Sequence, residues 1–115
     1  MERYVINGKE VEYDTFDLEN MEIYDREVRK VEEAVKSVDT KNMGDNYIAV
    51  LRDLAETILD FFDAVLGDGM AREIFGERTN IRDIKNGYRD FTQAVLKEMG
   101  TINNTPNREQ RRHAK

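Results

Sequence analysis

The segment 46–66 constrains the fold most strongly, because apolar residues cover it on almost every side. Its polar positions form one narrow acidic stripe along a helical period. A helix that is apolar over most of its girth has to be touched on several sides. The segment therefore predicts the central helix of a small bundle, in which the buried side chains include Leu54, Ile58, Phe62 and Val65.

Residues 4–13 show the pattern of a β-hairpin. Asn7 and Gly8 tolerate the positive φ angles that a tight hairpin turn requires. Because a lone hairpin is marginal in water, we expect it to pack on a helix. The apolar residues that alternate on either side of the turn are Tyr4, Ile6, Val11 and Tyr13.

Capping residues and glycines delimit the predicted helices, which cover residues 21–38, 46–66, 70–75 and 81–99. The expected N-caps of the three long helices are Asn20, Asp45 and Asn80, and the expected stops are Gly67, Gly76 and Gly100. The fold class is therefore mainly α, a bundle of three main helices and a short one after an N-terminal hairpin. The first helix has an apolar stripe made of Met21, Tyr24, Val28, Val31, Val35 and Val38.

The charge divides the chain into an acidic domain, residues 1–105, and a basic tail, residues 106–115. The formal net charge is −6, although the tail that follows Pro106 is itself positive. An acidic body repels phosphate, and we expect no helix to carry a basic recognition face. Nucleic acid is therefore a poor ligand for the domain. In the tail, Arg108, Arg111 and Arg112 are the candidate contacts to an acidic partner or a second copy of the chain.

Other features exclude several classes of protein. The chain has no cysteine, so disulfides and thiolate metal sites are excluded. No signal peptide is visible, and no apolar run approaches the roughly 20 residues of a membrane span, so a cytosolic location is expected.

Candidate catalytic groups are scarce. The acidic stripe of the central helix has no histidine beside it, so a solvated face explains it better than a metal site. The lone histidine, His113, lies in the tail without a fixed neighbour. We therefore expect no enzyme activity, no metal and no cofactor. The stripe consists of Asp53, Glu56, Asp60 and Asp63.

Residues 66–77 resemble a recurrent stretch in the tail assembly chaperones of long-tailed phages and prophages. In these proteins a helix ends in a glycine-containing turn, a short helix follows, and an asparagine leads the final helix. The segment 107–112, which contains three arginines, is similar to the basic ends of several members. The residues that carry the resemblance are Gly67, Gly69, Ile74, Phe75, Gly76 and Asn80.

The resemblance implies that the protein binds the tape measure protein and recruits tail tube subunits in the bacterial cytoplasm, and that it is absent from the finished virion. Two alternatives remain open. One is a small nucleic-acid-associated regulator that uses the basic tail, and the other is a structural head–tail connector component. Self-association is also left open.

Overall fold

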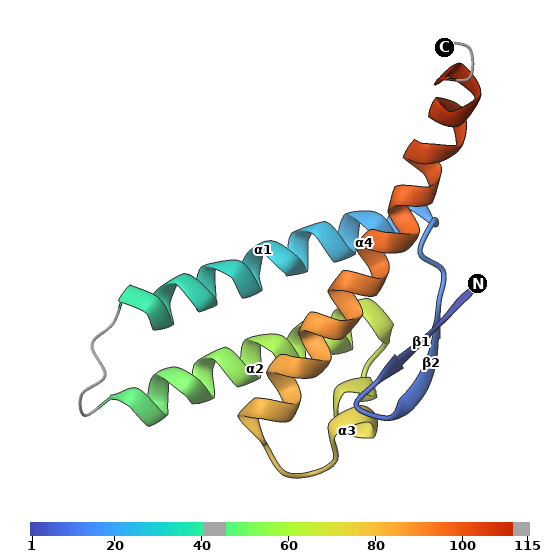
Figure 1. Cartoon of the computed structure of the whole chain (residues 1–115). Helices are drawn as coiled ribbons and strands as arrows, with labels where there is room; N and C mark the ends of the chain where they lie inside the picture. Colours follow the sequence, from blue (N-terminus) through green and yellow to red (C-terminus); the bar gives the residue numbers. More distant parts are fainter. Residues whose placement is uncertain (41–45, 112–115) are drawn as a thin grey trace.

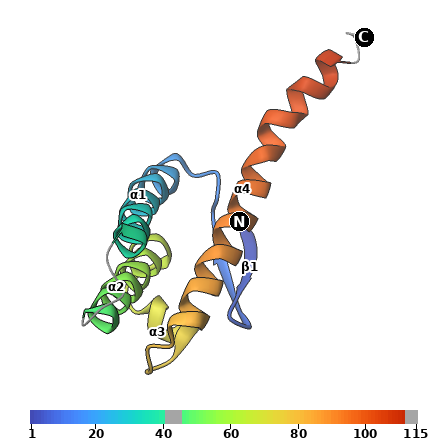
Figure 2. The same ribbon diagram turned by 60° about the vertical axis from the view of Figure 1, so that its left-hand side comes forward.

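A computed structural model describes the backbone of residues 1–40 and 46–111, and the side chains of residues 1–38 and 46–100. Within these residues the fold is mainly α with an N-terminal hairpin, as predicted. Helices α1 and α2 lie side by side in opposite directions, and α4 crosses α2 (Figure 1). The hairpin lies against α4, as Figure 2 also shows. The elements are β1 (Glu2–Ile6), β2 (Lys9–Tyr13), α1 (Leu18–Thr40), α2 (Tyr47–Leu66), α3 (Met70–Phe75) and α4 (Ile81–Arg111).

The hairpin forms as the Asn-Gly turn predicts. Asn7 has φ 51° and Gly8 has φ 80°, the positive angles of a primed turn. The strands are antiparallel, with Tyr4 opposite Val11. The buried face of the hairpin packs on α4, where the ring of Phe91 lies 5.2 Å from that of Tyr4 and 5.6 Å from that of Tyr13. The expectation that the hairpin packs on a helix is therefore confirmed.

Helix α1 begins three residues earlier than predicted. The carboxylate of Asp17 accepts hydrogen bonds from the backbone N–H groups of Glu19 (2.8 Å) and Asn20 (3.3 Å), so Asp17 is the N-cap. The prediction of Asn20 as the cap was wrong. Its side chain instead donates to the backbone carbonyl of Asp14 at 3.0 Å, which ties the helix to the end of the hairpin. Both residue types cap well, and the apolar stripe that begins at Met21 favoured the later one.

Helix α2 is the central element. Leu54, Ile58 and Phe62 are buried as predicted, whereas Val65 is only half-buried. Aromatic rings gather around its C-terminal half. The ring of Phe61 contacts that of Phe62 at 5.1 Å, and both lie about 6 Å from the ring of Phe91. These edge-to-face and tilted contacts join α2 to α4 at the centre of the core.

Glycines end α2 and α3 as predicted. Gly67 has φ 124° and Gly76 has φ 81°, and the N–H of each closes its helix on a carbonyl four residues earlier. Asn80 caps α4, because its side-chain oxygen accepts the N–H of Asp83 at 3.1 Å. The predicted end of this helix at Met99 was wrong.

Helix α4 continues through Gly100 to Arg111. Gly100 does not adopt the positive φ of the glycines that end helices, so its presence alone does not stop the helix. Residues 101–105, which were expected to form a loop, are helical, and so is the backbone of the tail as far as Arg111. The predicted boundary between domain and tail at residue 105 remains a prediction. Asp45, Arg112 and His113 lie outside the described residues.

Candidate protein-binding groove

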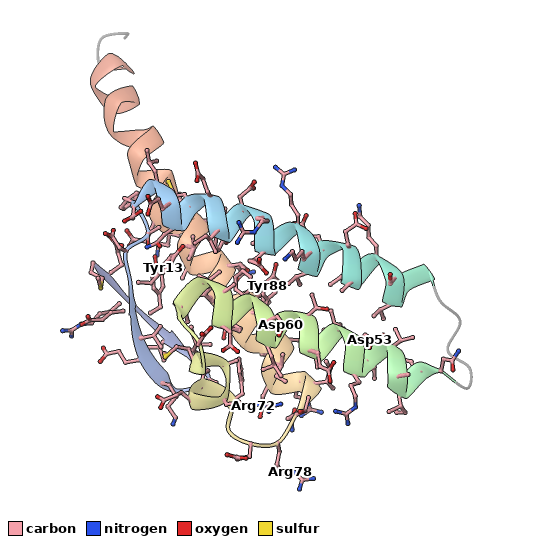
Figure 3. All side chains as sticks on the ribbon, turned by 180° about the vertical axis from the view of Figure 1, so that it is seen from behind. Tyr13, Asp53, Asp60, Arg72, Arg78 and Tyr88 are labelled. Atoms are coloured by element: carbon pink, nitrogen blue, oxygen red, sulfur yellow. The ribbon has the colours of Figure 1, made fainter. Side chains whose placement is uncertain are left out.

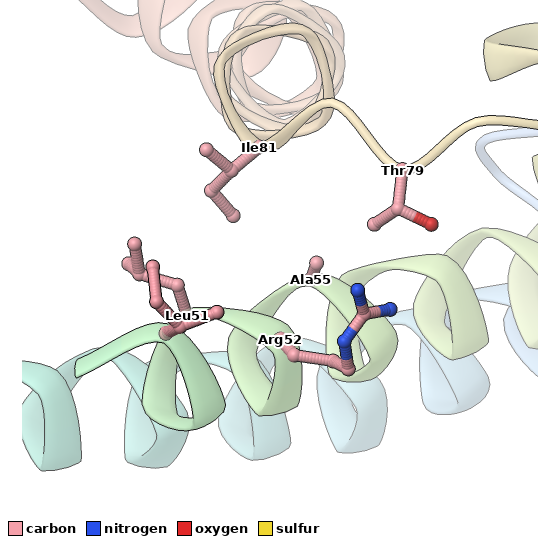
Figure 4. A pocket seen from close by; sticks show the side chains of 6 residues that line it. Leu51, Arg52, Ala55, Thr79 and Ile81 are labelled. Carbon is pink, nitrogen blue, oxygen red and sulfur yellow. The ribbon is translucent and has the colours of Figure 1, made fainter. Parts of the chain in front are cut away.

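The N-terminal ends of α2 and α4 enclose an open apolar groove. Three adjoining hollows form it: the middle one shares Leu51 and Ile81 with the first, and Lys85 and Asn86 with the third. Figure 4 shows Leu51 and Ala55 on α2 facing Ile81 at the start of α4 across the open space. We call this surface the groove. Its apolar lining consists of Tyr47, Ile48, Leu51, Leu54, Ala55 and Ile58 from α2, Ile81 and Tyr88 from α4, and Val31 and Val35 from α1.

Several of these apolar side chains lie in water. Ile48 is 69% exposed and Val35 is 40% exposed, although both belong to apolar stripes of their helices. An apolar stripe normally faces the core, but these two side chains are not covered. Ile48 lines the hollow beside Ile81 of α4, and Val35 lines the hollow beside Tyr88 and Arg89. Contiguous exposed apolar surface of this kind marks a binding site more often than scattered single residues do.

Basic side chains surround the groove. Arg52 lies on α2, and the other three occupy α4. Among the described residues that line the groove none is acidic, although the whole chain has 24 acidic and 18 basic residues. Three of these basic residues lie on one side of α4, although the expectation that no helix carries a basic recognition face for nucleic acid stays a prediction. The basic rim, as we call it, consists of Arg52, Arg82, Lys85 and Arg89.

Tyr88 forms an aromatic wall at the deep end of the groove. The ring of Tyr88 packs against that of Phe61 at 5.0 Å with an interplanar angle of 78°. Burial raises the pKa of Tyr88 to about 12, with a smaller contribution from the charge of Glu32 on α1. The phenol therefore stays neutral at any physiological pH. A fixed, neutral aromatic wall suits the binding of an apolar side chain.

Packing on the opposite side of α4 determines where this helix crosses α2. Gly87 is buried, and a methyl group there would lie 2.6 Å from the ring of Phe75 and 3.1 Å from Ile6. The side-chain amide of Asn7 donates to the backbone carbonyl of Ile74 at 3.0 Å, which joins the hairpin to α3. These contacts hold α4 against α3 and the hairpin, so its N-terminal end leaves the groove open.

Three residues of the acidic stripe, Glu56, Asp60 and Asp63, line a separate hollow between α2 and α3. Figure 3 shows Asp53 and Asp60 on α2, with Arg72 on α3 beneath them. Asp63 has a structural role, since its carboxylate accepts the N–H of Ala71 at 2.9 Å and so holds α3. Within the described part of the chain, no group of three or more acidic or histidine side chains is placed to hold a metal ion. The lack of a metal or cofactor stays a prediction.

The residues that carry the family resemblance form the connection between α2 and α4. Ile74 is buried, and the ring of Phe75 packs 5.3 Å from that of Phe62. Gly69 has φ 85° and precedes α3. Arg72 was missed by the sequence analysis: its guanidinium donates to the backbone carbonyls of residues 76, 77 and 78 at 3.2 to 3.4 Å. These residues therefore shape the connection and place the start of α4 beside α2.

The sequence also predicts contact residues in the basic tail. The side chains of Arg108, Arg111 and Arg112 fall outside the described residues, so they remain candidates without a structural test. The groove itself was not predicted, but part of its signal is visible in the sequence. Arg82, Lys85 and Arg89 are three and four residues apart, which places them on one side of a helix.

Comparisons with known proteins identify a family and no function. In the described residues, no helix is both long and apolar enough to cross a membrane. No curated protein and no solved structure matches the chain. Residues 7–115 match DUF6673, a family of unknown function, and the chain belongs to that family.

Proposed function

We propose that this member of DUF6673 acts without catalysis, by holding a helix of a partner protein in the groove. The observation that carries the proposal is the apolar lining around Ile48, which remains open to solvent on a folded domain. Amphipathic helices bind in such grooves through side chains spaced three, four and seven residues apart. The firm aromatic wall at Tyr88 would receive one of these side chains.

We propose further that the protein is a tail assembly chaperone. The support is the resemblance at residues 66–77, together with a helical body and the open groove. In this role the protein binds the tape measure protein in the bacterial cytoplasm, keeps it soluble and recruits tail tube subunits. It leaves before the tail is complete. A helix-binding groove suits this task because an extended helical protein exposes apolar stripes that aggregate unless they are covered.

Co-expression tests both the binding of a helix in the groove and the role as a tail assembly chaperone. The tape measure protein encoded beside this protein is expressed alone, with the wild-type chain, and with Ile48→Asp. Ile48 is 69% exposed, so the substitution places a charge in the groove with little effect on folding. Leu18→Asp is the matched control, because Leu18 is 72% exposed at the start of α1, outside the groove.

The wild type and Leu18→Asp are expected to raise the soluble fraction of the tape measure protein, and Ile48→Asp is expected not to. Circular dichroism on the purified variants confirms that both remain folded. If the tape measure protein stays equally insoluble with and without the wild-type chain, the chaperone role is refuted. If Ile48→Asp works as well as the wild type, the chaperone uses another surface.

A further inference from the structure

We infer that the groove takes an amphipathic helix whose apolar stripe is flanked by aspartate and glutamate residues. This inference rests on the proposed function, since it names the chemistry of the partner that the groove binds. It follows from the composition of the lining. An apolar floor selects for an apolar stripe, and the basic rim selects for acidic residues beside that stripe.

The concentration of positive charge at the groove contrasts with the rest of the protein. A separate hollow between α2 and α3, one helical turn along from Arg52, contains Glu56, Asp60 and Asp63 against a single Arg72. The chain as a whole is acidic, so four basic residues around one groove, with no acid in its described lining, are a local reversal of charge. Such a reversal steers an acidic partner to the groove, because the acidic surface of the rest of the protein repels that partner.

The basic rim is available for a partner. Arg52, Arg82 and Lys85 are exposed, and within the described residues none of them forms an ion pair. The guanidinium of Arg89 forms an ion pair with Asp90, its neighbour in sequence, at 3.4 Å, and both side chains are more than half exposed. Exposed pairs of this kind contribute little, so a partner carboxylate can replace Asp90 at small cost.

The rim residues lie on two helices. Arg82, Lys85 and Arg89 follow one side of α4 at spacings of three and four residues, and Arg52 lies across the groove on α2 (Figure 4). A helix lying in the groove would face basic groups on both flanks. Carboxylates three and four residues apart on that helix match the spacing along α4. Each arginine can hold a carboxylate through two parallel hydrogen bonds, which adds geometric selectivity to the attraction.

The test uses three synthetic helical peptides that share one leucine stripe and differ only in its flanks, which are glutamate, glutamine or lysine. Each peptide is labelled with fluorescein and titrated with the full chain while anisotropy is measured at low and high salt. We expect the glutamate peptide to bind at least about tenfold more tightly than the lysine peptide at low salt, and salt to reduce the difference. A labelled DNA duplex is the fourth probe.

Two substitutions on α4 supply the matched comparison. Lys85→Glu reverses a charge in the basic rim, and Lys97→Glu makes the same change in net charge on the same helix outside the groove. Lys85→Glu should weaken binding of the glutamate peptide several-fold and strengthen binding of the lysine peptide. Lys97→Glu should change the two peptides little. This exchange of preference cannot come from unfolding, which would weaken both.

The outcomes separate this inference from the proposed function. If all three peptides bind equally and Ile48→Asp abolishes the binding, the groove binds helices but the inference about acidic flanks is overturned. If no peptide binds, or if Ile48→Asp changes no affinity, helix binding in the groove is itself refuted. If only the DNA duplex binds and Lys85→Glu weakens it, the rim serves nucleic acid and both proposals are overturned.

Discussion

A single added methyl group at Gly87 tests the packing that places α4 over α2. Gly87→Ala would bring the new carbon to 2.6 and 2.7 Å from two ring atoms of Phe75 and to 3.1 Å from Ile6. Distances below 3 Å require a neighbour to move. Ile6 is fully buried, and the half-buried ring of Phe75 packs against Phe62, so a shift of Phe75 would disturb that contact.

Two effects of opposite sign determine the magnitude. Alanine is favoured over glycine in a helix interior by about 1 kcal/mol. Overpacking a well-filled site costs about 1–3 kcal/mol. Because the closest approach is to a ring that packs against the fully buried Phe62, the cost should lie in the upper part of that range. We expect Gly87→Ala to lower the free energy of unfolding by about 1–2 kcal/mol.

Gly100→Ala is the matched control, since it makes the same change in the same helix. A methyl group at Gly100 would meet nothing within 4 Å, and Gly100 does not have the positive φ that resists substitution. Only the helix preference remains, so this variant should raise the free energy of unfolding by about 0.5–1 kcal/mol. Urea denaturation followed by circular dichroism measures both values. If Gly87→Ala stabilises the protein as much as Gly100→Ala does, the close packing of α4 on Phe75 is refuted.

Three further substitutions or conditions address the rest of the fold. Phe62→Ala removes a fully buried ring and should cost ~3–5 kcal/mol in urea denaturation; a cost well under ~1 kcal/mol would contradict its central position. Asp17→Ala removes the cap of α1 and should cost ~1 kcal/mol, whereas Asp17→Ser should retain most of the stability; equal losses would mean that the cap contributes nothing. Burial raises the pKa of Tyr13 and of Tyr88 from 10.0 to about 12, so the folded state holds their protons more tightly than the unfolded state does. The stability that this difference supplies is complete below pH 10 and is lost as the pH rises to 12, so tyrosinate absorbance and helical content should change together in that range; full ionisation of these tyrosines without loss of helix would contradict their burial.

Local chemistry allowed most of the elements to be predicted. The turn at Asn7-Gly8, the cap at Asn80 and the stops at Gly67 and Gly76 each depend on a few neighbouring residues, and the structure confirms them. The two errors in helix ends have a common cause. Asp17 and Asn20 are both good caps, and Gly100 is compatible with either a stop or a continuing helix, so the choice depends on packing that lies elsewhere in the chain.

The groove depends on contacts between segments far apart in sequence, and so it could not be predicted. Its shape follows from the crossing of α4 over α2, which is held by Gly87, Phe75 and Ile6. Periodicity shows that Ile48 and Val35 lie on apolar stripes but not which neighbour covers each turn of the helix. The basic rim was partly visible, since the spacing of Arg82, Lys85 and Arg89 alone places them on one side of α4.

The apolar residues around α2 are buried near one end of the helix and exposed at the other. A helix of 20 residues is about 30 Å long. Near its C-terminal end, Phe61 and Phe62 are fully enclosed by rings from α1, α3 and α4. At its N-terminal end, Ile48 faces the open groove. The same apolar pattern thus forms an intramolecular core at one end and an exposed surface at the other. If the groove binds a partner helix, as we propose, burial of Ile48 would complete the enclosure that the apolar pattern of α2 predicts.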